Sequence, residues 1–277
     1  MSGNRNRLEL LARLGYAARG VVSLIVGGLA LLAALGRGGW TTDSKGALQT
    51  LMQQPLGEIL LGIVAVGLFG FALWRLFQSL LDADGLGTAP KALARRAGQA
   101  VSAVVYFGLG VFATRLLLAA GRTGGGEQDA RDWTAWLLGQ PFGRWVVAAA
   151  GLALIGAAIG IAYRAWTASF HQRLACGDAA RWVVPLGRLG FAARAVVLLT
   201  AGAFLVIAAY RSDPSAARGL SGVLLALQEQ PFGQALFAMV ALGLAAFGLF
   251  GLVQARFRRI DAPRPGEIVA AAKRGIA

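Results

Sequence analysis

Long blocks of apolar residues alternate with polar connections along the chain. Six blocks stand out, at residues 16–35, 56–81, 101–120, 142–166, 191–210 and 232–253. An α-helix of about 20 apolar residues spans the hydrocarbon core of a bilayer. The pattern therefore predicts an all-α, polytopic membrane protein with six transmembrane helices.

A four-residue motif, which we call the doorway motif, stands at the start of every second block. It reads Gln-Pro-(Leu/Phe)-Gly, and its copies are Gln54-Pro55-Leu56-Gly57, Gln140-Pro141-Phe142-Gly143 and Gln230-Pro231-Phe232-Gly233. Proline suits the first turn of a helix, where its missing N–H would have no partner anyway. We therefore expect the proline in the first turn of each following span and the glycine to permit a close turn.

The other three blocks also begin alike. Arg13-Leu14-Gly15-Tyr16 returns as Arg188-Leu189-Gly190-Phe191 and, more faintly, as Arg96-Ala97-Gly98-Gln99. The interval from this glycine, interpreted as a helix start, to the doorway proline is nearly constant. The chain is therefore predicted to hold three tandem two-helix membrane repeats, at 13–84, 96–170 and 188–260, with a basic cytoplasmic tail at 261–277.

Short segments ahead of each doorway motif have apolar residues at helical spacing. These residues are Leu48 and Leu51, then Trp133, Trp136 and Leu137, and finally Leu220, Val223, Leu224 and Leu227. They predict short amphipathic helices in the outer loops, with Asp43, Asp129 and Ser215 or Ser221 as N-caps. Helices lying flat among the headgroups, with the tryptophans as anchors, are favoured over a gate or lid.

The first block also has an alternative interpretation as a secretory signal peptide, because basic residues precede it. Its return as the fifth block, deep inside the chain, argues for a retained span instead.

The composition and the distribution of charge predict how the chain is oriented in the membrane. Hydrophobic residues make up 57% of the chain, charged residues 14%, and the net charge is +14. Most of the Lys and Arg residues lie at the two ends and in the second and fourth connections, which marks the cytoplasmic face. Both termini are therefore predicted in the cytoplasm. The excess charge follows topology, so we expect contact with acidic lipid headgroups rather than with nucleic acid.

Five arginines fall within or beside the spans. Arg19, Arg75, Arg164 and Arg194 lie near the predicted cytoplasmic ends, where they can reach the headgroups. Arg115 is the candidate intramembrane charge, because its counterparts in the other repeats are Leu32 and Ile207. Extension to the outer surface is favoured over an anion site or a pairing with a carboxylate such as Glu58.

The spans also carry aromatic and small residues. The aromatic residues near span ends are interpreted as interfacial belts, namely Trp74, Trp145, Tyr163 and Trp166. Glycines allow close helix packing, among them Gly27, Gly28, Gly67, Gly108, Gly110, Gly156, Gly160 and Gly248.

Residues for catalysis or metal binding are scarce. His171 and Cys176 are the single His and the single Cys, so no disulfide can form within the chain and no His/Cys cluster with the usual four metal ligands can be built. Glu127, Asp129 and Asp132 could bind a divalent cation, although a solvated acidic loop is the simpler interpretation. We expect no enzymatic activity, cofactor or metal.

The repeated start motif and doorway motif make the chain resemble the bacterial integral membrane family called domain of unknown function 1206. The resemblance covers about residues 13–260, with Gln99 departing from the pattern where Tyr16 and Phe191 stand. It implies a bacterial inner membrane location and brings no assigned activity or catalytic residues.

Two functions from different classes remain open. One is a non-enzymatic scaffold or accessory subunit that binds helices of other membrane proteins or acidic lipid. The other is a transporter or channel for a small molecule, ion or lipid, with a cavity on a pseudo-threefold axis. The thin polar content of the spans favours the first.

Overall fold

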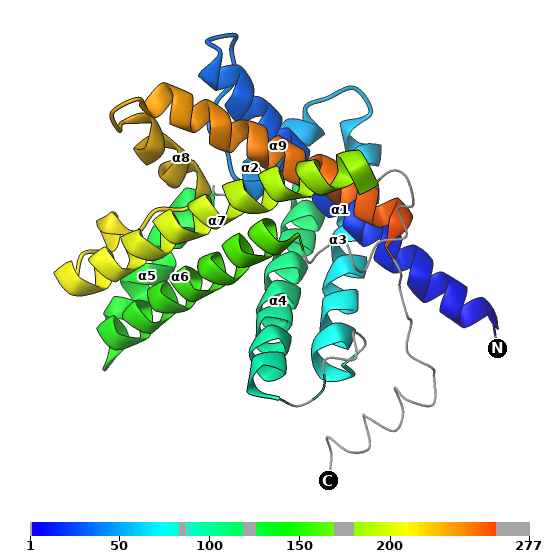
Figure 1. The fold of residues 1–277 in the computed structure, drawn as a ribbon, viewed down its shortest axis with the longest axis horizontal. Helices are drawn as coiled ribbons and strands as arrows, with labels where there is room; N and C mark the ends of the chain where they lie inside the picture. The colour runs from blue at the N-terminus through cyan, green and yellow to red at the C-terminus, as the bar shows by residue number, and fades with distance from the viewer. Residues whose placement is uncertain (1, 83–86, 88, 119–125, 169–179, 259–277) are drawn as a thin grey trace. The chain divides into compact units, whose positions relative to one another are not determined.

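The computed structural model describes residues 2–82, 87, 89–118, 126–168 and 180–258. Its long helices are α1 (Ser2–Ala34), α3 (Gly57–Leu80), α4 (Pro90–Leu118), α6 (Gly143–Thr167), α7 (Ala180–Arg211) and α9 (Gly233–Phe257) (Figure 1). No β-strand occurs in the described ranges, and the all-α prediction is confirmed. His171, Cys176 and the predicted tail at 261–277 lie outside the described residues.

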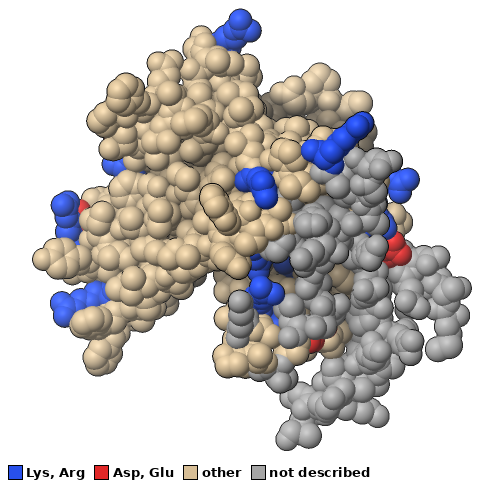
Figure 2. Space-filling view, viewed as in Figure 1, with Lys and Arg blue, Asp and Glu red and all other residues tan. Residues whose placement is uncertain are grey.

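The six long helices are all apolar enough to cross a membrane. Their mean hydropathy over the most apolar window runs from 1.8 to 2.4. Large apolar side chains stand exposed along them, and Figure 2 shows that uncharged atoms make up most of the described surface on the side drawn. Such a surface suits a hydrocarbon solvent rather than water. The chain is a multi-pass membrane protein, as the apolar blocks predict.

The three short helices predicted before the doorways are also present, as α2 (Ser44–Met52), α5 (Gly126–Leu138) and α8 (Leu220–Gln228). Asp43 caps α2 as predicted, because its carboxylate accepts the backbone N–H of Gly46 at 2.9 Å. Trp133 and Trp136 on α5 are exposed and pack edge to face, as interfacial anchors would.

The other two N-cap predictions are wrong. Asp129 lies inside α5, where its carboxylate pairs with Lys45 of α2. Helix α8 starts after Gly219, and neither Ser215 nor Ser221 caps it. Asp213 instead caps the short 3-10 helix η3 (Pro214–Ala216), and its hydrogen bonds from the Ser215 hydroxyl and backbone N–H lower the pKa of Asp213.

The chain forms two compact units. Unit 1 comprises residues 1–19, 51–121 and 251–277, and unit 2 comprises 20–50 and 122–250. Helix α4 packs on α3 in unit 1, and α6 packs on α7 in unit 2 (Figure 1). The two spans of the middle repeat therefore belong to different units. The repeat boundaries themselves stay a prediction.

One glycine contact recurs at equivalent positions of all three repeats. Gly110 of α4 lies against Phe69 of α3, and an added Cβ would come within 2.9 Å of the Phe69 ring. At the matching positions, Gly202 of α7 lies against Ile155 of α6, and Gly27 of α1 against Ala245 of α9. The first span of each repeat therefore packs on the second span of another repeat, through a glycine and a partner at equivalent positions.

A second glycine contact joins the two spans within the first and third repeats. A Cβ on Gly15 would lie 2.6 Å from the backbone nitrogen of Phe71, and one on Gly190 would lie 2.7 Å from the Cα of Phe247. In the middle repeat Gly98 has open space around it, and Ala157 replaces the phenylalanine. These glycines lie inside long helices, so their interpretation as helix starts is wrong; close packing explains them in the outer repeats.

Some of the other glycines predicted to pack closely contact a neighbouring helix, and others do not. Gly67 packs against Ala18, and Gly248 against Leu24, whereas Gly28, Gly108, Gly156 and Gly160 have open space beside them. The prediction of close packing is therefore wrong for these last four within the described chain.

Candidate functional site

The doorway motifs form the same turn in all three copies. The N–H of Gly57, Gly143 and Gly233 donates to the carbonyl oxygen of the motif glutamine at 2.8, 2.9 and 2.7 Å. The third residue of each motif has a φ of 60 or 61°. Proline second and a positive φ third are typical of a type II β-turn. Each following helix begins at the glycine, so the proline lies in the β-turn before the helix. The prediction that the proline stands in the first turn of the helix is therefore wrong.

The doorway glycine is required by the end of the preceding short helix. A Cβ on Gly143 would lie 1.7 Å from the carbonyl oxygen of Leu137, and one on Gly233 would lie 2.0 Å from that of Gln228. The side-chain amides of Gln140 and Gln230 donate to carbonyls of the same short helices, at 3.4 and 3.3 Å. The motif is thus a structural joint between an outer helix and a span.

Arg115 lies in the last turn of α4. It is exposed and forms no hydrogen bond or ion pair with any described residue, Glu58 included. This position lets the guanidinium extend past the helix end toward the headgroups. A functional role for Arg115 stays a prediction.

Two residues predicted at the membrane surface are instead buried in unit 1. Arg19 is 6% exposed, and its Nη2 donates to Oε1 of Gln254 at 3.1 Å. Trp74 is 3% exposed and packs with Tyr16 and Phe71 in one apolar cluster. The headgroup position of Arg19 and the belt position of Trp74 are therefore wrong, because both side chains face α1, α3 and α9 neighbours rather than lipid.

Three guanidinium groups surround this aromatic cluster. Arg19 and Arg75 lie 5.3 and 4.9 Å from the ring centroid of Phe71, and Arg258 lies 4.9 Å from that of Tyr16. These are cation–π distances. We call Tyr16, Arg19, Trp74, Arg75 and Arg258 the donor cluster, because each can donate a hydrogen bond from its polar end.

Two members of the donor cluster lack a hydrogen-bond partner among the described residues. They are the hydroxyl of Tyr16 and the indole N–H of Trp74, both buried. Buried polar groups in proteins are nearly always hydrogen-bonded, so such an exception needs an explanation.

The third repeat builds the same core without these polar ends. Phe191 and Phe250 stand where Tyr16 and Trp74 stand, and Gly251 replaces Arg75. Phe191 packs edge to face on both Phe247 and Phe250, at 5.6 and 5.5 Å between ring centroids. Packing alone therefore does not require the polar ends. Sequence reasoning missed the donor cluster, although this comparison between repeats was available as a signal.

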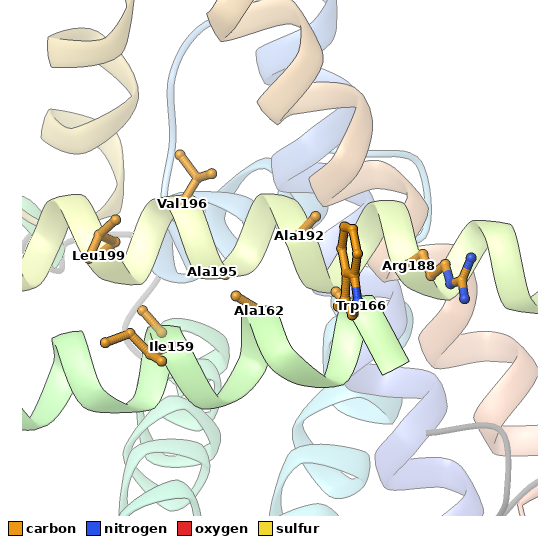
Figure 3. A pocket seen from close by; sticks show the side chains of 10 residues that line it. Ile159, Ala162, Trp166, Arg188, Ala192, Ala195, Val196 and Leu199 are labelled. Carbon is orange, nitrogen blue, oxygen red and sulfur yellow. The ribbon is translucent and has the colours of Figure 1, made fainter. Parts of the chain in front are cut away.

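A separate apolar groove lies between α6 and α7 in unit 2. Its volume is about 570 Å³, and its lining includes Ile159, Ala162 and Trp166 of α6 and Arg188 and Leu199 of α7. Figure 3 shows Trp166 and Arg188 at one end of the groove and Ile159 and Leu199 at the other.

Arg188 differs from its counterparts in the other repeats. Arg13 donates to the carbonyls of Ala255 and Arg256 at 2.9 and 2.7 Å, at the end of α9. Arg96 donates to those of Ser79 and Leu80 at 2.7 and 3.1 Å, at the end of α3. Both stabilise the last turn of a neighbouring span. Arg188 is exposed and makes no hydrogen bond or ion pair with any described residue, so its guanidinium is available at the groove end.

Metal binding has no support in the described parts of the chain, where no group of three His, Cys, Asp or Glu residues could hold an ion. Asp129 is engaged by Lys45. The side chain of Glu127 lies outside the described residues.

Comparisons with known proteins agree with the repeat pattern. The model of the family described as Domain of Unknown Function (DUF1206) matches three times, at residues 14–82, 97–168 and 189–258. The uncharacterized protein YxxB of Bacillus subtilis (strain 168) is 33% identical over 257 residues, which is 91% of this chain and 92% of that protein. No solved structure matches. Three family matches and this relative establish that the chain belongs to the DUF1206 family.

Proposed function

We propose that the protein is a non-enzymatic scaffold or accessory protein of the bacterial inner membrane that binds an anionic phospholipid in the groove between α6 and α7. The observation that carries the proposal is Arg188, a guanidinium without a described partner at one end of an apolar groove.

The groove has the chemistry of a phospholipid. Its lining is almost wholly apolar, as an acyl chain requires, and its volume of about 570 Å³ lies within the usual range for ligand pockets. A guanidinium can bind a phosphate group through two parallel hydrogen bonds. The groove is lined by α6 and α7 alone rather than by equivalent residues of three repeats, which favours a lipid site over a threefold transport cavity.

Arg188→Gln is expected to weaken the binding of an anionic phospholipid by at least about tenfold, because a hydrogen bond to a charged group contributes about 1.5–3 kcal/mol. Native mass spectrometry of the detergent-purified protein with phosphatidylglycerol and phosphatidylcholine measures this. The control is Arg181→Gln, which removes an exposed arginine of the same helix that does not line the groove.

A second variant tests the apolar part of the groove. Ala162→Leu should fill it and reduce binding of both lipids, while Arg188 is intact. If neither Arg188→Gln nor Ala162→Leu changes lipid binding, the proposed site is wrong.

We further infer that both termini face the cytoplasm. The support is that Arg13 bonds to carbonyls at the end of α9, which places basic residues of both chain ends at one end of the spans. Excess basic charge in short connections marks the cytoplasmic side.

Labelling of single cysteines tests this orientation. In a Cys176→Ser background, Ser215→Cys should react with an impermeant maleimide in intact cells, whereas Ser2→Cys should react only after permeabilisation. The opposite pattern, or labelling of both in intact cells, would exclude the orientation.

A further inference from the structure

We propose that the donor cluster of unit 1 binds a phosphate-type oxyanion, either as free phosphate or as a lipid phosphate group. The site goes beyond the lipid groove, because the groove lies in unit 2 and shares no residue with the donor cluster.

Electrostatics provide the first argument. The guanidinium of Arg19 lies 5.8 Å from the ring of Tyr16 and 5.3 Å from that of Phe71, on which Arg75 also packs. Aromatic rings attract cations but carry no net charge. Three guanidinium groups gathered around one pair of rings therefore make this part of unit 1 favourable for an anion.

Hydrogen bonding provides the second argument, and it is independent of the arginines. The Tyr16 hydroxyl and the Trp74 indole N–H are buried and accept or donate no hydrogen bond within the described chain. An indole N–H can only donate, so its partner must be an acceptor. An oxyanion supplies several acceptors at once, whereas a cation supplies none.

The donor cluster has a partly exposed part and a buried part. Arg75 and Arg258 are partly exposed, while Tyr16, Arg19 and Trp74 are buried. In this proposal the anion reaches the buried donors past the two partly exposed arginines.

The third repeat shows which groups the fold itself does not need. It has Phe191 and Phe250 at the positions of Tyr16 and Trp74, and these phenylalanines pack in an equivalent core. Tyr16→Phe and Trp74→Phe therefore copy residues that this architecture already accepts, and they remove only the candidate donors and part of one ring.

The test uses the full chain, purified and delipidated in neutral detergent. Isothermal titration with inorganic phosphate, at constant ionic strength set by chloride, should show binding by the wild type. The Tyr16→Phe/Trp74→Phe variant should bind phosphate at least about tenfold more weakly, since charged hydrogen bonds are the stronger class. Arg188→Gln, which tests the lipid groove, and Arg194→Gln in the third repeat should leave phosphate binding unchanged.

A second arm identifies the source of the phosphate group. Nanodiscs of phosphatidylcholine with and without phosphatidic acid are compared for the same proteins. If only phosphatidic acid is retained, and the double variant loses it, the site takes a lipid headgroup. If free phosphate binds and the double variant loses it, the site takes the soluble anion. Equal behaviour of wild type and double variant with both probes would overturn the proposal and leave the donor cluster a purely structural feature.

Stability of the variants must be checked in the same experiment. The double variant should melt within a few degrees of the wild type in the absence of phosphate. If it does not fold, Arg75→Gln, at a partly exposed position that is glycine in the third repeat, provides the same comparison.

Discussion

Gly27→Ala is expected to lower the free energy of unfolding by about 2–3 kcal/mol, as overpacking of a tight contact does. The added Cβ would lie 2.2 Å from the backbone nitrogen of Ala245 and 2.7 Å from its Cα. Backbone atoms cannot move aside by changing rotamer, so α1 and α9 would have to separate. The thermal unfolding of the purified protein in detergent measures the effect.

The neighbouring glycine provides the matched control. Gly28 is in the same helix and has nothing within 4 Å of an added Cβ. Gly28→Ala should leave stability unchanged or raise it by up to about 1 kcal/mol, because alanine favours helix more than glycine does. If both variants melt like the wild type, the close contact of α1 with α9 is not formed.

Gly143→Ala is expected to cost about 3 kcal/mol or more, because the overlap is with backbone and the turn cannot relax without breaking. The new Cβ would fall 1.7 Å from the carbonyl oxygen of Leu137. The turn would have to open, and α5 would lose its fixed connection to α6. Protease or hydrogen-exchange protection of α5 should fall together with the melting temperature.

Gly156→Ala is the control for this second prediction. It lies in the same helix α6 with open space beside it. An equal loss of stability in both variants would show that the helix simply responds to added side chains, and it would contradict the role given to the doorway turn.

Much of the fold could be predicted from the sequence, because spans and amphipathic helices leave local patterns. A block of about 20 apolar residues can be assigned to the membrane without knowing which helices pack beside it. The cap of α2 by Asp43 was also predictable, since it joins residues close in sequence. The predicted N-cap role of Asp129 is wrong because its carboxylate pairs with Lys45, which lies far away in the sequence.

The donor cluster was harder to predict because burial of a helix face depends on which helix covers it. Arg19 and Trp74 look like surface residues in sequence, and only the packing of α1, α3 and α9 buries them. The difference between Tyr16 and Phe191 was visible, but its meaning requires the ring contacts of both repeats.

The contact of α1 with α9 has a consequence for synthesis in the cell. The side-chain amide of Gln234 donates to the carbonyl of Ala34, two residues that are 200 positions apart. At about 5–20 residues per second, roughly 10–40 s separate the emergence of these helices from the ribosome. The glycine face of α1 must therefore wait among lipids, or against a temporary neighbour, until the last hairpin is inserted.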